Sequence, residues 1–334
     1  MSSVILIFII ALVGTLISTP FVRRLAIAIG FVDAPALRKL HSTPMPLMGG
    51  VAIFGGALVA LILAALRVRP FYAPEVQGIL LACFVVALTG LIDDRINLPP
   101  WAKFLGQVIG FGILVAFDVT VKLPLPLWLN YLITFFWVTG ISNAINFLDN
   151  MDGLSAGVSG VCAAFIMLLA ALHGQILVSG LAAAVLGACL GFLRYNFKPA
   201  QIFMGDVGTL FLGFLLAILG IQLRFPDNSN AVTWMVPVLI LGLPIFDTTL
   251  VVVSRLRRGI SPLTGGKDHT SHRLVDRGMS QREAVLLLYL MAGTYGMTAI
   301  FVTQATVLEG YFVGGTVAAA SLYVLWRLDR NYSK

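Results

Sequence analysis

The chain has 334 residues, of which 59% are hydrophobic and 11% are charged, and its mean hydropathy is +0.95. This composition excludes a chain folded around a single core in water and indicates a polytopic membrane protein. The formal net charge of +7 reflects mainly where the basic residues lie between the spans, so we expect no nucleic-acid partner.

Apolar stretches of about 20 residues, the length that crosses the hydrocarbon core of a bilayer, recur along the chain. We therefore expect an all-α integral membrane protein of about eleven transmembrane helices, folded as one polytopic domain over residues 1–334. Pro124 and Pro126 interrupt the region of the fourth and fifth helices. The expected spans are 3–22, 49–66, 77–92, 103–120, 124–142, 154–172, 176–193, 208–223, 232–253, 284–304 and 309–326.

The basic residues predict the orientation, because Lys and Arg are held on the cytoplasmic side of a membrane. With the N-terminus outside, 18 of the 22 lysines and arginines fall in inner segments and only 4 fall outside. The C-terminus is then cytoplasmic, and in a bacterial plasma membrane the active site would face the cytoplasm. It would be formed by the inner segments 23–48, 93–102, 143–153, 194–207 and 254–283.

Two adjacent acids, Asp93 and Asp94, end the apolar run 80–92. A carboxylate at the middle of a bilayer costs roughly 2.5 to 3.5 kcal/mol, so acids in or beside membrane helices usually serve a ligand, an ion or a proton. Paired acids repel unless a cation lies nearby, and Lys103 opens the next helix. The alternative is that the pair caps the neighbouring helix and binds Arg95.

In the segment NAINFLDNMDGLS, polar residues recur at every third position, and on a helix they would form a ladder along one side. They are Asn143, Asn146, Asp149 and Asp152. Amide oxygens and carboxylates suit a hard cation such as Mg²⁺. The alternative is a polar seam between helices.

Asn196 and Asp206 bracket the segment NFKPAQIFMGD, and Asp206 stands just before a new helix. Acidic capping of that helix is a serious alternative for Asp206. Its coincidence with the other acids favours a shared site.

The last inner loop contains a glycine pair followed by closely spaced donors, as expected where phosphate or sugar oxygens are bound. These donors are Lys267, His269, His272 and Arg273. We exclude zinc, because no further His or Cys accompanies the two histidines.

Other residues near these segments have weaker assignments. His41 lies in a basic segment rich in proline, where binding of a substrate phosphate and a place at the membrane interface are equally supported. Arg255, Arg257 and Arg258 are interpreted as ordinary positive-inside residues. For Asp247 we expect a hydrogen-bonding role rather than a cation site.

Together, the motifs GLIDDR, NAINFLDNMDGL, FMGDVGTLFLG, PIFDT and KDHTSHRL resemble the polyprenyl-phosphate N-acetylhexosamine-1-phosphate transferases of the glycosyltransferase 4 type. Relatives of this family start teichoic-acid, O-antigen and peptidoglycan lipid intermediates, and the resemblance covers most of the chain. It implies transfer of N-acetylglucosamine 1-phosphate from a UDP-sugar to undecaprenyl phosphate, which leaves UMP and initiates cell-envelope polysaccharide synthesis. The implied cofactor is Mg²⁺, with Mn²⁺ as a substitute, and a homodimer stays open.

The resemblance also implies roles for the motif residues. Asp93 and Asp94 would accept the proton of the lipid phosphate or order the metal and Lys103. We favour a direct in-line attack by the lipid phosphate, and a covalent aspartyl-phosphate route stays open. The expected site comprises the catalytic residues Asp93, Asp94, Lys103, Asp149 and Asp152, the substrate-binding residues Asn143, Asn196, His269, His272, Arg273, Lys267 and His41, and the metal ligands Asn146 and Asp206.

Two alternative functions follow from the same residues. The first is a phospho-MurNAc-pentapeptide transferase, but that branch would show a histidine-rich run where this chain has KDHTSHRL, which favours an N-acetylhexosamine donor. The second, from another class, is a cation-coupled transporter, which predicts inverted repeats and a site near the midplane. The sequence contains no visible repeat, and its acids gather toward one face.

Overall fold

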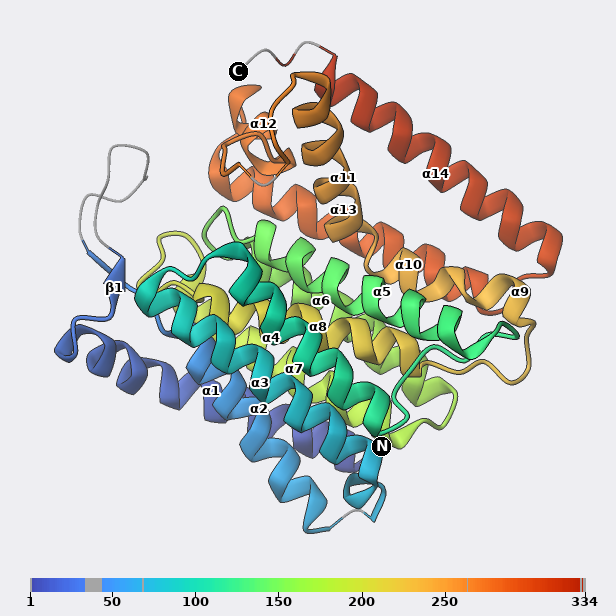
Figure 1. The fold of residues 1–334 in the computed structure, drawn as a ribbon, viewed down its shortest axis with the longest axis horizontal. Coiled ribbons are helices and arrows are strands. Elements are labelled where there is room, and N and C mark those ends of the chain that lie inside the picture. Colours follow the sequence, from blue (N-terminus) through green and yellow to red (C-terminus); the bar gives the residue numbers. More distant parts are fainter. Residues whose placement is uncertain (1, 34–43, 68, 263, 331, 333–334) are drawn as a thin grey trace.

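The computed structural model describes residues 2–33, 44–67, 69–262, 264–330 and 332, and these form a bundle of helices (Figure 1). The elements are α1 (Ser2–Ala28), β1 (Val32–Asp33), β2 (Met45–Pro46), α2 (Gly49–Ala65), the 3₁₀ helix η1 (Arg69–Tyr72), α3 (Pro74–Ile96), α4 (Pro100–Ala116), α5 (Leu127–Phe147), α6 (Leu154–Leu172), α7 (Ile176–Asn196), α8 (Gly205–Gln222), α9 (Asn230–Thr233), α10 (Met235–Ile240), α11 (Gly242–Arg257), α12 (Thr270–Asp276), α13 (Gln281–Val302) and α14 (Val307–Asp329). The two strands pair antiparallel, with Val32 opposite Pro46. The predicted site residue His41 lies outside the described residues.

The all-α membrane class is confirmed, and each of the eleven expected stretches contains helix. Among the described residues, seven helices are long and apolar enough to cross a membrane, namely α1, α3, α6, α7, α8, α13 and α14. An eighth span results if α9 to α11 are counted as one bent helix. The helices α2 and α4 are apolar but have only 17 residues each, about 26 Å at the usual helical rise.

The expectation of one continuous helix over 232–253 is wrong, because the chain bends by 71° between α10 and α11. Pro244 lies in the first turn of α11 and has no amide hydrogen for a helix that continues from α10. Gly242 sits at the bend, where a Cβ atom would lie 2.8 Å from the ring of Tyr295 on α13. This bend directs the end of α11 toward α12 (Figure 1).

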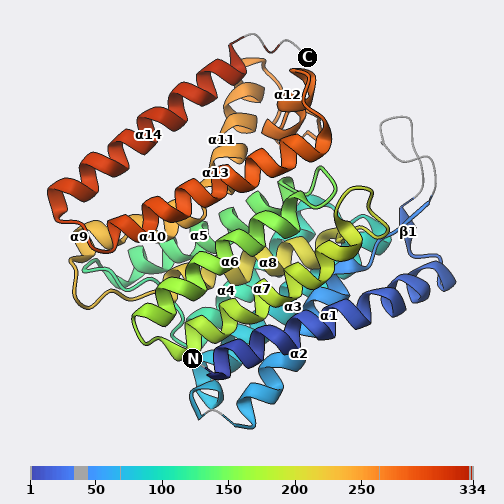
Figure 2. The ribbon, with the colours of Figure 1, turned by 180° about the vertical axis from the view of Figure 1, so that it is seen from behind.

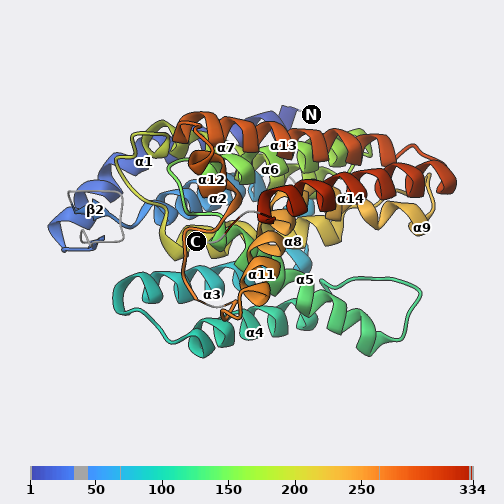
Figure 3. The same ribbon diagram turned by 90° about the horizontal axis from the view of Figure 1, so that it is seen from above.

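The central helix of the bundle is α8, whose apolar stretch of 18 residues is 89% buried. It packs against α2, α3 and α5, and Figure 3 shows α8 between the layer that contains α3 and α4 and the layer that contains α7 and α13. Glycine allows its first turn to approach α3, since a Cβ atom at Gly90 would lie 2.4 Å from the carbonyl oxygen of Asp206. The fold thereby brings Asp206 beside the acidic end of α3.

The last helix stands apart from the bundle. Only 6% of the most apolar 18-residue stretch of α14 is buried. Figure 2 shows α14 along one edge, beside α11 and α13. Its C-terminal turn lies near α12 (Figure 1), where the Arg273 guanidinium donates to the carbonyl of Leu328 and to the carboxylate of Asp329.

Candidate active site

A lysine bridges two acids where α3, α4 and α8 meet. The ammonium nitrogen of Lys103 lies 2.8 Å from Oδ2 of Asp93 and 2.5 Å from Oδ2 of Asp206. Asp93 also accepts a hydrogen bond of 2.7 Å from the amide of Leu98, which holds the turn between α3 and α4. The side chains of Lys103 and Asp206 are 27% and 23% exposed, so a ligand can reach them.

Asp94 caps the first turn of α8. Its Oδ1 and Oδ2 accept hydrogen bonds from the amides of Asp206 at 2.8 Å and Val207 at 3.1 Å. Gly205 turns the chain there with a φ of +73°, a region in which other residues are strained. The capping alternative therefore holds for Asp94, although the helix is α8 and not the neighbouring α4.

The alternative in which the acid pair binds Arg95 is not what the structure shows. The Arg95 guanidinium instead donates a 3.2 Å hydrogen bond to the carbonyl of Gly30 and lies over the ring of Phe31. Lys103 supplies the cation that the acid pair requires.

Asn146 joins α5 to the acidic cluster. Its side-chain amide donates to Oδ1 of Asp206 and to Oγ1 of Thr209, both at 2.8 Å. Thr209 was missed in the sequence, although its place three residues after Asp206 puts it on the same side of α8. Asn143 lies one turn earlier and bonds Gln107 and Thr139.

The polar ladder predicted in this segment is wrong beyond Asn146, because α5 ends at Phe147. Asp149 and Asp152 lie in the turn before α6, where Gly153 has a φ of +80°. The turn folds back on the cluster, so Asp149 still lies within the electrostatic range of Asp206.

Burial raises the pKa of Asp149 to about 7, and the negative charges of Asp206 and Asp152 add to this effect. In the described part of the chain, the carboxylate of Asp149 has no hydrogen bond and no ion pair. A carboxylate in this state would be stabilised by a cation bound nearby.

Asp152 and Asn196 hold the loop between α7 and α8. Asp152 accepts a 3.0 Å hydrogen bond from the amide of Ala200 and lies 3.5 Å from the ammonium of Lys198. Asn196 is 3% exposed and bonds the amide of Gly153 and the carbonyl of Ile202, both at 3.0 Å. These contacts fix the backbone around the cluster, and the predicted catalytic and binding roles of the two residues stay predictions.

The segment 264–273, which we call the donor loop, contains His269 and His272. Oδ2 of Asp247 lies 2.8 Å from Nδ1 of His269, and Oδ1 accepts a 2.7 Å hydrogen bond from the amide of Thr270. The hydrogen-bonding role expected for Asp247 is confirmed. Because Nδ1 of His269 is occupied, Nε2 is the nitrogen left for a ligand.

The donor loop touches the turn that carries Asp149. Oγ of Ser271 donates a 2.5 Å hydrogen bond to Oδ1 of Asn150, and the ring of His269 lies 6.4 Å from that of Phe147. The turn after α5 therefore connects the acidic cluster to the segment that contains the histidines.

Arginines organise the donor loop, a function that the sequence did not reveal. Arg255 is 4% exposed and binds Asp268 with two hydrogen bonds, at 2.8 and 2.6 Å, while Arg258 adds a third at 2.8 Å. Burial of Asp268 opposes its ionisation, but the hydrogen bonds and charge of Arg255 hold its pKa below the usual value. The positive-inside rule describes the location of Arg255 but not this ion pair.

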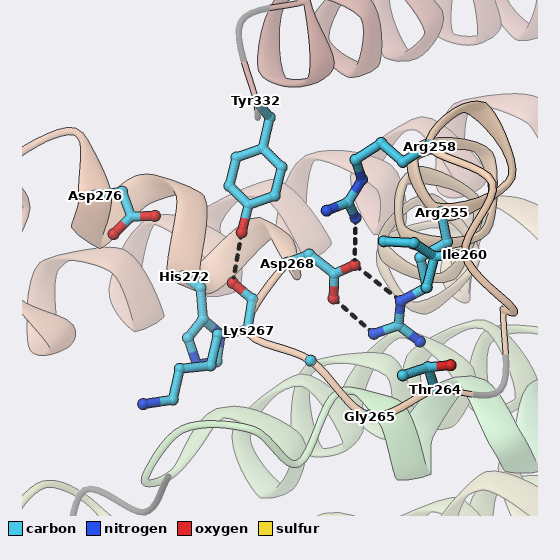
Figure 4. Close-up of a pocket in the computed structure, with 11 residues that line it drawn as sticks. Arg255, Arg258, Ile260, Thr264, Gly265, Lys267, Asp268, His272, Asp276 and Tyr332 are labelled. Carbon is cyan, nitrogen blue, oxygen red and sulfur yellow. Dashed lines mark hydrogen bonds and ion pairs between the residues drawn. The ribbon is translucent and has the colours of Figure 1, made fainter. Parts of the chain in front are cut away.

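A cavity of about 310 Å³ opens beside these residues (Figure 4). Lys267 and His272 line it together with Arg258 and Tyr332. Burial, followed by the positive charges of His269 and Lys267, lowers the pKa of His272 to about 4, so this ring is neutral near pH 7. Arg273 is buried behind the loop, and its predicted contact with substrate stays a prediction.

The donor atoms of the cluster suit a hard divalent cation. Asp206 and Asp149 offer carboxylate oxygens, and Asn146 offers an amide oxygen if its side chain is turned over, which are the ligand types that Mg²⁺ and Mn²⁺ prefer. Within the described residues, no three His, Cys, Asp or Glu side chains form a closed set of metal ligands. This chemistry fits an open site whose remaining ligands come from substrate phosphates and water.

Comparison with known proteins identifies the family of the chain. Residues 76–224 match the family model described as glycosyl transferase family 4. The chain is 36% identical to the "Probable undecaprenyl-phosphate N-acetylglucosaminyl 1-phosphate transferase" of Bacillus subtilis strain 168, over 94% of this chain and 88% of that protein. It is 35% identical to the decaprenyl-phosphate N-acetylglucosaminephosphotransferase of Mycolicibacterium smegmatis, over 85% and 80%. A Yersinia pestis undecaprenyl-phosphate alpha-N-acetylglucosaminyl 1-phosphate transferase is 25% identical, over 92% and 88%.

Proposed function

The chain belongs to glycosyl transferase family 4, and from this premise we propose that it transfers N-acetylglucosamine 1-phosphate from UDP-N-acetylglucosamine to undecaprenyl phosphate. The products are a lipid-linked diphosphate sugar and UMP. The observation that carries the proposal is the convergence of Asp93, Lys103, Asn146 and Asp206 from four helices. Both substrates are polyanions that react at phosphorus, and such reactions depend on charges placed around the transferring group.

In the proposed topology, the seven long helices and the bent span are joined by α2, α4 and α5 to make eleven spans, with the N-terminus outside. The distribution of Lys and Arg supports this orientation. The site would then face the cytoplasm of a bacterial cell, beside the inner leaflet that holds the lipid phosphate.

Asp206 and Asn146 are the proposed ligands of Mg²⁺, and Asp149, whose pKa is raised by the charge of Asp206, is a further candidate that would join them or bind a water of the ion. When bound, the ion would neutralise the diphosphate and make its phosphorus easier to attack. Supporting this assignment are the oxygen-rich donor set and the unpartnered carboxylate of Asp149.

Lys103 is the proposed ligand of the diphosphate. In the free protein its ammonium is shared by Asp93 and Asp206, and a phosphate oxygen would take a place beside it as a further anionic partner. Asp94 maintains this arrangement from behind, because it fixes the first turn of α8. On the opposite side, Asp247 orients His269. Its Nε2 would donate a hydrogen bond to the nucleotide-sugar when that nitrogen carries the proton.

In the proposed reaction, an oxygen of the lipid phosphate forms a bond to the sugar-bearing phosphorus while the bond to the bridging oxygen breaks. That bridging oxygen leaves with UMP. The second pKa of a phosphomonoester is about 6, so the lipid phosphate is largely doubly ionised at neutral pH. Its attacking oxygen therefore needs little help from a base to lose a proton. Both oxygens of Asp94 accept backbone hydrogen bonds, which supports direct attack over a covalent intermediate on that residue.

The test is a reconstitution of the purified protein in vesicles with undecaprenyl phosphate, UDP-N-acetylglucosamine and MgCl₂. We expect UMP and the lipid product to form in equal amounts, as measured by mass spectrometry. Neither product should form when EDTA is added. The Asp206→Ala variant is the inactive control. Failure to release UMP, together with uptake driven by an ion gradient, would establish the transporter instead.

The identity of the sugar is tested in the same vesicles. UDP-N-acetylglucosamine should react faster than UDP-MurNAc-pentapeptide, in agreement with the short donor-loop motif KDHTSHRL. The reverse order would assign the chain to the peptidoglycan branch without changing the reaction class.

A further inference from the structure

The last turn of α14 contacts the donor loop directly, through Arg273. Most of α14 is exposed, because only 6% of its most apolar 18-residue stretch is buried. Its last residues differ, because Leu328 and Asp329 are 8% and 3% exposed. The chain is therefore buried where it meets the loop, although the helix that leads there is not.

An ion pair buried on both sides makes the first connection. Oδ1 of Asp329 lies 3.1 Å from Nη1 of Arg273, whose side chain is 1% exposed. Oδ2 of Asp329 lies 3.1 Å from Nη2 of Arg257 at the end of α11. The Arg273 guanidinium also donates to the carbonyls of Asp268 at 2.8 Å and Leu328 at 3.1 Å.

Buried ion pairs contribute little to stability because both charges lose their water, but a broken pair leaves a charge without a partner. In its buried position Arg273 joins the carbonyl of Asp268 in the donor loop to Asp329 of α14, and loss of Asp329 would leave its charge without that partner. Asp268 and His269 are neighbours in sequence, so this geometry extends to the histidine that Asp247 orients.

Tyr332 makes the second connection. Its hydroxyl donates a 2.9 Å hydrogen bond to the carbonyl of Lys267 (Figure 4). The centre of its ring lies 4.0 Å from the guanidinium carbon of Arg273, a cation–π contact. Tyr332 thereby forms a wall of the cavity whose other sides include Lys267 and His272.

We propose that Asp329 and Tyr332 are positioning residues that hold the donor loop in its substrate-binding arrangement, so that the end of the chain sets the affinity for the nucleotide-sugar. This inference rests on the proposed function, in which the donor loop binds UDP-N-acetylglucosamine. Neither residue touches the reacting atoms. They act through the backbone of Lys267 and Asp268 and through the side chain of Arg273.

The experiment measures KM separately for the two substrates in the variants Tyr332→Phe, Asp329→Asn and Asp329→Glu. Tyr332→Phe keeps the ring and removes one hydrogen bond, so KM for UDP-N-acetylglucosamine should rise about threefold to tenfold. Asp329→Asn leaves Arg273 without its counter-charge and should raise it about tenfold or more. Asp329→Glu restores the charge and should recover part of the loss. KM for undecaprenyl phosphate should stay within about twofold throughout, because in the proposed function the loop binds the nucleotide-sugar and not the lipid.

The matched control is Arg330→Ala, since Arg330 is at the same helix end but lies over Trp326 of its own helix. It should leave both KM values unchanged. A residue that only anchors α14 would lower the unfolding temperature without moving the donor KM, or would raise both KM values alike, and either result would overturn the proposal.

Amide hydrogen exchange separates this inference from the proposed function. Asp329→Asn should speed exchange over residues 264–273 whether or not the wild-type protein releases UMP. Unchanged protection of that segment refutes the positioning role, even if the transferase reaction is confirmed. Faster exchange in a protein that is inactive with UDP-N-acetylglucosamine would leave the attachment correct and the proposed substrate wrong, and positioning for that substrate would fall with it.

Discussion

The ammonium nitrogen of Lys103 lies 2.5 Å from Oδ2 of Asp206, although 103 residues separate them in the chain. The same nitrogen lies 2.8 Å from Asp93, so one cation relieves the repulsion between acids of α3 and α8. Lys103 thus holds the start of α4 against α3 and α8, and it is also the group best placed to meet a substrate phosphate.

Replacing Lys103 by methionine tests this double function. Lys103→Met should lower kcat/KM by about a hundredfold or more, because it removes a cation that would face the transferring phosphoryl group. The measurement is UMP release at saturating Mg²⁺. Lys122→Met is the matched control, since Lys122 pairs with Asp118 in an exposed turn. Retention of more than a tenth of the activity by Lys103→Met would place the diphosphate elsewhere.

Asp94 should behave as a cap and not as a nucleophile. Asp94→Ala removes the acceptors for two amides of α8 and should lower the free energy of unfolding by about 2 kcal/mol, with a parallel loss of turnover. Asp94→Asn keeps one acceptor oxygen, so its stability and turnover should lie between those of the wild-type protein and those of Asp94→Ala. Thermal unfolding in detergent and UMP release provide both readouts.

Thr306→Ala serves as the control for Asp94, because Thr306 caps α14 away from the site. It should lower stability and leave turnover unchanged. If Asp94→Asn were inactive at wild-type stability, Asp94 would take part in the chemistry directly.

The titration of Asp149 predicts a pH dependence of stability. Its pKa is raised in the folded protein to about 7, from an ordinary value of 3.8, so between these values the folded state binds more protons than the unfolded state. Stability should therefore fall as pH rises from about 4 to about 7, and the loss should be complete above that range. Unfolding temperatures at pH 5, 6, 7 and 8 in EDTA test this.

Asp149→Asn should flatten that pH dependence, because the amide cannot titrate. Added Mg²⁺ should stabilise the wild-type protein most at pH 8, where Asp149 is ionised, and should affect Asp149→Asn much less. An equal Mg²⁺ effect in the two proteins would exclude Asp149 from the neighbourhood of the ion.

Asp247 and His269 should act as a pair. Asp247→Asn loses a charge-assisted hydrogen bond to His269, a contact worth about 1.5 to 3 kcal/mol, and kcat/KM should fall about tenfold to a hundredfold. His269→Gln should fall at least as far. In the double variant the losses should not add, because either change removes the same oriented ring. Additive losses would mean that Asp247 supports the loop independently of His269.

Periodicity and charge predicted much of the fold. The apolar stretches located the helices, because a segment that crosses lipid must be apolar over its whole length. They did not predict the 71° bend at Gly242, against which the ring of Tyr295 packs from a helix more than 50 residues away. Nor did the three-residue spacing after Asn143 show where α5 ends, because the turn at Gly153 is held by Asn196 from α7.

The composition of the candidate site was also predicted, but not the partners of its residues. Acids near lipid are costly, and this alone singled out Asp93, Asp94, Asp149 and Asp206. No local pattern indicated that Asp94 caps α8 or that Asp268 pairs with two arginines, because each contact joins segments that meet only after folding. Asp329 and Tyr332 had no motif at all.

The sequence by itself determined that this protein lies in a lipid bilayer and which charged residues its helices carry near the membrane, because hydropathy and residue type are local properties. Only the tertiary structure decided which charges neutralise each other. Lys103 reaches Asp206, and Arg273 reaches Asp329, because the glycine at position 90 admits the first turn of α8 and the bend at Gly242 turns α11 toward the end of α14. Distances between residues far apart in the chain depend on such packing, and no local pattern encodes them.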